Sequence, residues 1–160
     1  MPAAHLFDIS GVDLSAVAIA PDRVGELNPQ SGDMRQLDHV IWHDKALAHA
    51  VGVKAASPDE FWVSGHIPGR PLFPGVLMIE AGAQLASIIF RLRSQEERFL
   101  AFTRCDEVVF RHQVVPGDTL LLLMKEVQFK PRRFICRTQG LVHDQIAFEA
   151  TITGMVVADA

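Results

Sequence analysis

Three polar side chains at helical spacing interrupt an otherwise apolar stretch of the sequence. Residues 75–93 contain no proline and are dominated by Leu, Ile, Met and Ala, so they predict a helix buried on most of its faces. Glu80, Gln84 and Ser87 share one stripe of that helix, because they follow one another at intervals of four and three residues. A buried carboxylate is costly unless it is paired, hydrogen-bonded or protonated. We therefore interpret Glu80 as a functional carboxylate with Gln84 as its hydrogen-bonding neighbour. The structural alternative is a Glu80 that faces solvent or pairs with a core arginine.

A histidine lies just upstream of this helix, in a stiff loop. His66 belongs to the segment GHIPGRPLFPG, residues 65–75, in which prolines at a spacing of three favour an extended backbone. A loop that fixes the backbone of a histidine suits a general base. A lone histidine is more often structural, so this second interpretation stays open.

Gly75 stands at the expected start of the helix. The first N–H groups of a helix have no partner within it and carry the positive end of the helix dipole. A glycine there lets a substrate oxygen approach the backbone closely, which suits a developing oxyanion. Close packing against another element explains the glycine equally well.

These residues supply a base, an acid and an oxyanion donor, but no nucleophile. Ser64 and Ser87 do not lie in a G-x-S-x-G motif. Proton transfer next to a carbonyl therefore fits better than acyl-enzyme chemistry. A metal centre is the less favoured alternative, since the spacings match no zinc pattern; its ligands would be drawn from His39, His43, His49, His112, His143, Cys105 and Cys136. We expect no metal and no cofactor.

The surrounding pattern predicts an α+β fold in which an antiparallel sheet wraps around the helix. Before the helix we expect strands over 38–56 and 59–64, with a turn at residues 57–59 between them. After it, the expected strands are 99–110, 119–129 and 134–142, followed by a last strand beyond the turn at 143–145. In that last strand the period of two places Ile146, Phe148, Ala150, Ile152 and Val156 on one face.

Composition narrows the class of protein. With 49% hydrophobic and 21% charged residues, the chain is not intrinsically disordered, and its net charge of −4 disfavours nucleic acid as a partner. Two cysteines indicate free thiols in a reducing compartment, and one disulfide in a secreted protein is the alternative. The N-terminal residues lack a signal-peptide pattern, and no uncharged apolar run is long enough for a membrane span. We expect a cytoplasmic protein.

Two segments resemble one enzyme family. Residues 65–84, GHIPGRPLFPGVLMIEAGAQ, resemble the signature GHFPxxPVMPGVLxxEAxAQ of the 3-hydroxyacyl-acyl-carrier-protein dehydratases of FabZ type. Residues 110–118, FRHQVVPGD, are similar to the F-R-x-P-V-V-P-G-D segment of that family. The resemblance covers roughly residues 28–157. The sequence departs from the family pattern at residues 29–39. It also contains no tyrosine, so that Phe99 or Phe102 would take the place of a tyrosine gate on the acyl tunnel.

The resemblance implies a fold, a reaction and an assembly. The fold would be the hotdog, with residues 26–160 as its single domain and 1–25 as an N-terminal extension. The reaction would convert (3R)-3-hydroxyacyl-acyl-carrier-protein to the trans-2-enoyl product in fatty acid biosynthesis, with His66 as base and Glu80 as acid. Glu80 resembles the FabZ branch, because the FabA branch carries Asp there. Family members form homodimers with shared active sites, often as trimers of dimers, so that His66 would face the Glu80 of its partner.

Further residues follow from the same resemblance. Gly75, Val76 and Gln84 would bind the substrate, and the candidates for an acyl tunnel are Ile67, Phe73, Phe99 and Phe102. The acidic acyl carrier protein would dock on cations, for which the candidates are Arg91, Arg93, Arg98, Lys130, Arg132 and Arg133. The alternatives are a hotdog thioesterase, a specialised polyketide or lipid-pathway dehydratase, and a non-catalytic acyl-carrier-binding homologue.

Overall fold

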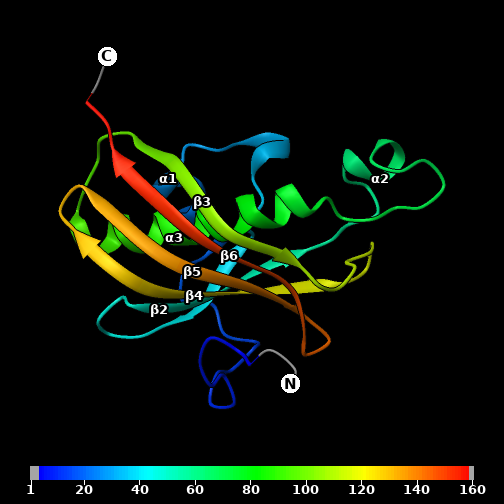
Figure 1. The fold of residues 1–160 in the computed structure, drawn as a ribbon, viewed down its shortest axis with the longest axis horizontal. Coiled ribbons are helices and arrows are strands. Elements are labelled where there is room, and N and C mark those ends of the chain that lie inside the picture. The colour runs from blue at the N-terminus through cyan, green and yellow to red at the C-terminus, as the bar shows by residue number, and fades with distance from the viewer. Residues whose placement is uncertain (1–3, 159–160) are drawn as a thin grey trace.

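In the computed structural model, which describes residues 4–158, an antiparallel sheet curls around one long helix, α3 (Gly75–Ser94) (Figure 1). The sheet has six strands in the order β1-β2-β4-β5-β6-β3. The strands are β1 (His39–His43), β2 (His49–Ala55), β3 (Leu100–Phe110), β4 (Thr119–Lys130), β5 (Arg133–Val142) and β6 (Gln145–Val156). The short helices α1 (Pro21–Leu27) and α2 (Trp62–Gly65) and a 3₁₀ turn (Gly32–Met34) precede α3. The expected α+β arrangement, an antiparallel sheet wrapped around the helix, is confirmed.

Helix α3 forms the centre of the core. It begins after Pro74 and ends at Gln95, whose left-handed φ of 57° stops the helix. By length and mean hydropathy this helix would be able to cross a bilayer, but half of its apolar window is buried inside the protein's own fold. The inner face of the sheet supplies that cover, with Phe148 and Ile152 of β6 among the buried side chains.

The outer face of the sheet carries a second apolar cluster. Its buried members are Ile41, Val51, Val53, Leu123, Leu141 and Ile146. Leu6, Phe7, Ile9 and Val12, from the N-terminal segment, pack against this cluster. Gln139 anchors the segment: its side-chain oxygen accepts from the Leu6 N–H at 2.9 Å, and its amide donates to the Ala4 carbonyl at 3.0 Å.

The strand expected over residues 59–64 is wrong, because this segment forms α2. Ser57 and Glu60 form a hydrogen-bonded turn before the helix, in which the Ser57 N–H donates to Glu60 Oε1 at 2.9 Å. Trp62 is then buried, with its ring against Phe73 at a centroid distance of 5.1 Å. Loose alternation of residue types favoured a strand, but the burial of Trp62 against Phe73 fixes a short helix here.

The single strand expected over residues 38–56 is also wrong, since the segment is the hairpin β1–β2. Asp44 builds the turn, because its carboxylate accepts from the N–H groups of Ala48 and His49. Leu47 adopts a φ of 55° without being glycine.

The face assigned to Ile146 in the last strand is wrong as well. A register shift between Gly140 and Leu141 of β5 leaves Ile146 in the outer cluster, and Ala147 joins the inner core instead. Phe148, Ala150, Ile152 and Val156 lie in the inner core as predicted.

Candidate active site

The loop after α2 holds His66 in a defined orientation. His66 Nδ1 lies 2.7 Å from the carbonyl oxygen of Leu72. A carbonyl oxygen only accepts, so Nδ1 carries the hydrogen. In the neutral ring Nε2 is therefore an unprotonated acceptor, and the His66 side chain is exposed to solvent. A fixed, accessible imidazole nitrogen is what a general base requires.

The residues around this loop anchor it on both sides. The Phe73 N–H donates to the Val114 carbonyl at 2.8 Å, which ties the loop to the connection between β3 and β4. Buried Lys54 pairs with Glu60 at 3.0 Å, and Glu60 also accepts from the Trp62 indole N–H at 2.9 Å. These contacts restrict the backbone that carries His66.

Glu80 is held by the expected neighbour. Gln84, only 1% exposed, donates from Nε2 to Glu80 Oε1 at 2.8 Å. The same amide donates to the Met34 carbonyl at 2.7 Å, and its oxygen accepts from the backbone N–H groups of Gln36 and Leu37 at 2.9 and 3.1 Å. Gln84 thus fixes one carboxylate oxygen of Glu80 and joins the 34–37 segment to α3.

Gln84→Leu should destabilise the protein, because the N–H groups of Gln36 and Leu37 lose their buried acceptor. We expect the free energy of unfolding to fall by about 2 kcal/mol or more. Urea unfolding followed by circular dichroism measures the change. Gln113→Leu, at an exposed position, is the control. A Gln84→Leu protein as stable as the parent would contradict this account of the network.

Glu80 borders a cavity of about 210 Å³ between α3 and the sheet. The helix contributes Glu80, Ala83 and Ser87 to its wall, and residues 99–102, at the start of β3, lie opposite. Of the expected tunnel residues, Phe99 and Phe102 line this cavity. Ile67 and Phe73 do not, since Ile67 is exposed on the loop and Phe73 is buried against Trp62.

No sequence pattern separately selects the other residues of this wall. Pro29 and Gln30 cover it from the segment that departs from the family pattern, and Phe134, Ile152 and Gly154 reach it from β5 and β6. The strand alternation that buries Phe134 was the available signal for a wall residue, but alternation alone does not distinguish a cavity wall from core.

Gly75 occupies the first position of α3, beneath an aromatic ring. A Cβ atom at this position would lie 2.6 Å from Phe110 Cε1, so the glycine permits a close packing contact. The N–H groups of Gly75 and Val76 make no hydrogen bond to another residue within 4–158. The packing role of Gly75 therefore rests on a direct contact. The oxyanion role of the Gly75 and Val76 N–H groups stays a prediction.

His66 does not line the cavity that Glu80 borders. No residue of the 61–75 segment lines the cavity that contains Glu80. In Figure 1 the segment around α2 extends away from the sheet at the N-terminal end of α3. The described residues of one chain therefore give His66 and Glu80 no shared cavity.

The cations expected to dock a carrier lie in two groups. Arg91, Arg93 and Arg98 surround the C-terminal end of α3, and Lys130, Arg132 and Arg133 surround the β4–β5 turn. Arg98 is paired with Glu96 at 2.8 Å, and this hydrogen bonding lowers the pKa of Glu96 to about 2. Arg93 pairs with Glu126 and stacks on the Phe129 ring. The two groups share the end of the molecule opposite α2 (Figure 1).

No three His, Cys, Asp or Glu side chains gather in a metal-binding arrangement among residues 4–158. His43 and His49 both contact Asp44 in the β1–β2 turn. Cys105 and Cys136 form no disulfide.

A family model described as a FabA-like domain matches residues 28–151. The chain belongs to the FabA-like family. This FabA-like chain is 38% identical over 109 residues to a 3-hydroxyacyl-[acyl-carrier-protein] dehydratase FabZ of Moorella thermoacetica, which covers 68% of the chain and 76% of that relative. It is 34% identical over 140 residues to the bifunctional enzyme LpxC/FabZ of Porphyromonas gingivalis. That match covers 85% of this chain but only 30% of the longer bifunctional relative.

Solved structures share the fold of this FabA-like chain. The dehydratase heterocomplex ApeI:P of Xenorhabdus doucetiae superposes with a TM-score of 0.72 at 15% identity, over 85% of this chain and 91% of that one. Cj0977 of Campylobacter jejuni, described as a sigma28-regulated virulence protein, gives a TM-score of 0.68 at 16% identity, over 92% and 97% of the two chains. At these identities the likeness concerns the hotdog fold alone.

Proposed function

We propose that this protein dehydrates (3R)-3-hydroxyacyl-acyl-carrier-protein to the trans-2-enoyl thioester in fatty acid biosynthesis. One observation carries the proposal: Gln84 fixes the carboxyl group of Glu80 in the wall of an apolar cavity. A general acid held beside space for an acyl chain fits this reaction. The M. thermoacetica relative, whose name describes the same activity, supports it.

The elimination needs two proton transfers. Nε2 of His66 removes a proton from C2, the C2–C3 double bond forms, and the C3–O bond breaks. Protonated Glu80 gives its proton to the departing hydroxyl, so that water leaves. The N–H groups of Gly75 and Val76, at the N-terminus of α3, stabilise the negative charge on the thioester oxygen. Gln84 keeps Glu80 pointed at the substrate.

We propose that the working unit is a homodimer in which His66 of one protomer meets Glu80 of the other. β3 is an edge strand of the sheet, and it exposes Val108, Val109 and Phe110 near its end. An unpaired strand edge with apolar side chains is suited to pairing with a second copy. A trimer of such dimers is compatible with this pairing.

The partner in the proposal is an acidic acyl carrier protein in the cytoplasm. The cations at the end of α3 and at the β4–β5 turn are the proposed docking groups. Lys130 and Arg132 are the exposed members that lie outside the ion pairs described above.

The test is a dehydration assay with carrier-bound 3-hydroxyacyl substrates. We expect formation of the enoyl thioester, followed by its absorbance, and hydration of crotonyl thioester in the reverse direction. Release of free thiol instead would identify a thioesterase. Binding of acyl carrier without turnover would identify a non-catalytic homologue.

A further inference from the structure

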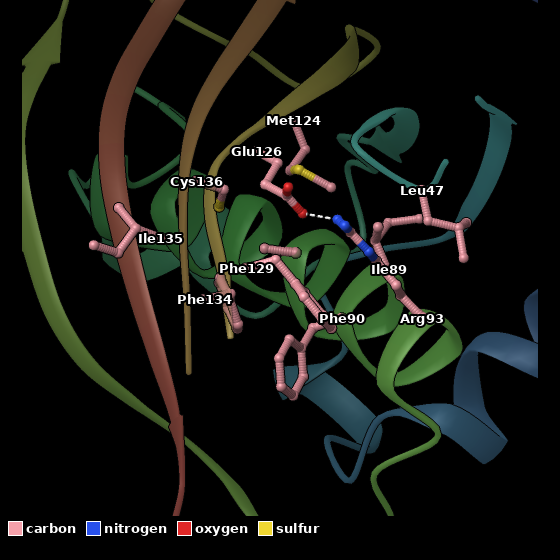
Figure 2. A pocket seen from close by; sticks show the side chains of 11 residues that line it. Leu47, Ile89, Phe90, Arg93, Met124, Glu126, Phe129, Phe134, Ile135 and Cys136 are labelled. Carbon is pink, nitrogen blue, oxygen red and sulfur yellow. Dashed lines mark hydrogen bonds and ion pairs between the residues drawn. The ribbon is translucent and has the colours of Figure 1, made fainter. Parts of the chain in front are cut away.

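Phe134 separates the Glu80 cavity from a second cavity. It is 6% exposed and lines both of them. The second cavity, of about 20 Å³, lies between α3 and strands β4 and β5, and has room for about one water molecule. Figure 2 shows the labelled rings of Phe90, Phe129 and Phe134 around it, with Arg93 joined to Glu126 by a dashed line.

The position of the Phe134 ring depends on a glycine in the neighbouring strand. Phe134 of β5 pairs directly with Gly154 of β6. A Cβ atom at residue 154 would lie 2.2 Å from Phe134 Cε1, so the ring occupies the space that a side chain there would fill. Phe90 of α3 holds the ring from the other side, with their centroids 5.3 Å apart. The ring is therefore clamped between helix and sheet.

The Glu80 cavity runs along α3 toward this ring. Glu80, Ala83 and Ser87 line it in turn, a distance of about 10 Å along the helix axis. Phe90 follows one turn after Ser87 and contacts Phe134. In the proposed reaction Glu80 protonates the leaving hydroxyl, so the reacting end of the substrate lies beside Glu80. The acyl chain then extends along the cavity, and its distal end points toward Phe134.

We propose that Phe134 is the end wall of the acyl site and sets the longest chain that the enzyme accepts. The inference rests on the proposed dehydratase function. Loss of the ring joins the two cavities and extends the site into the space lined by Ile89, Met124 and Cys136. A longer acyl chain then fits without displacing the aromatic cluster.

The test compares Phe134→Ala and Phe134→Leu with the parent protein. Hydration of trans-2-enoyl carrier substrates of four to sixteen carbons gives kcat/KM for each length, expressed relative to the four-carbon substrate of the same variant. At the first length that the parent rejects, we expect this ratio to rise about tenfold or more in Phe134→Ala, and less in Phe134→Leu. Binding of saturated acyl carriers of the same lengths is measured in parallel and should extend to the same longer chains.

Phe129→Ala is the matched control, because Phe129 belongs to the same ring cluster but lines only the second cavity. Its length profile should match the parent. Thermal unfolding establishes that each variant is folded. If Phe134→Ala is not folded, the comparison rests on Phe134→Leu. An unchanged profile in a folded Phe134 variant, or an equal shift in Phe129→Ala, overturns the proposal. If the parent turns over no substrate, the dehydratase function fails, while the binding series still decides the role of Phe134.

Discussion

His66→Ala should lower kcat for hydration of crotonyl thioester by about 10²- to 10⁴-fold, the usual contribution of a general base. Nε2 is the acceptor that the Leu72 carbonyl leaves free, and alanine removes it. His66→Asn should be nearly as impaired, although its side-chain amide can still donate to the Leu72 carbonyl. The comparison separates the loss of the base from the loss of the loop contact.

His143→Ala is the control for this histidine, because His143 is an exposed residue in the β5–β6 turn. It should retain parental kcat. A His66→Ala protein that keeps near-full hydratase activity would remove His66 from the mechanism.

Glu80→Gln should cause a loss of similar size, about 10²- to 10⁴-fold in kcat. The substitution keeps the size of the side chain and an oxygen that can accept from Gln84 Nε2, but it cannot deliver a proton at the pH of the assay. We therefore expect its thermal unfolding to stay close to that of the parent. Glu26→Gln, on the exposed face of α1, is the control and should leave kcat unchanged.

Mixing the two inactive variants tests whether the site is shared. A dimer of one His66→Ala and one Glu80→Gln subunit contains one intact site only if the two residues meet across the interface. Random subunit exchange should then restore about a quarter of parental activity. Persistent inactivity in verified mixed dimers would mean that each chain builds its own site.

The sequence indicated the central helix and the later strands well, because their signals are local. The apolar run at 75–93 and the turn at His143 agree with α3 and the β5–β6 hairpin within a residue. The turn at Asp44 was missed because a side chain builds it without glycine or proline. Helix α2 was missed because it has only four residues, too few to show a helical period.

Part of the candidate site was predictable, because the signal for that part is also local in the sequence. The spacing of Glu80 and Gln84 on a helix dictates their contact, which the structure contains. The contact of Gln84 with the N–H groups of Gln36 and Leu37 joins segments almost fifty residues apart, and no local pattern encodes it. The sequence alone does not identify Phe134 as a cavity wall, because its position there depends on the packing of β5, β6 and α3.

The second apolar cluster, on the outer face of the sheet, bears on where this domain begins. The family model begins at residue 28, yet Leu6, Phe7, Ile9 and Val12 are the side chains that pack over Val51, Leu123 and their neighbours. A fragment that begins at residue 28 would expose this apolar cluster to water, and an exposed apolar surface promotes aggregation. The N-terminal segment is therefore part of the folded unit in this structure, although it lies outside the residues that the family model matches.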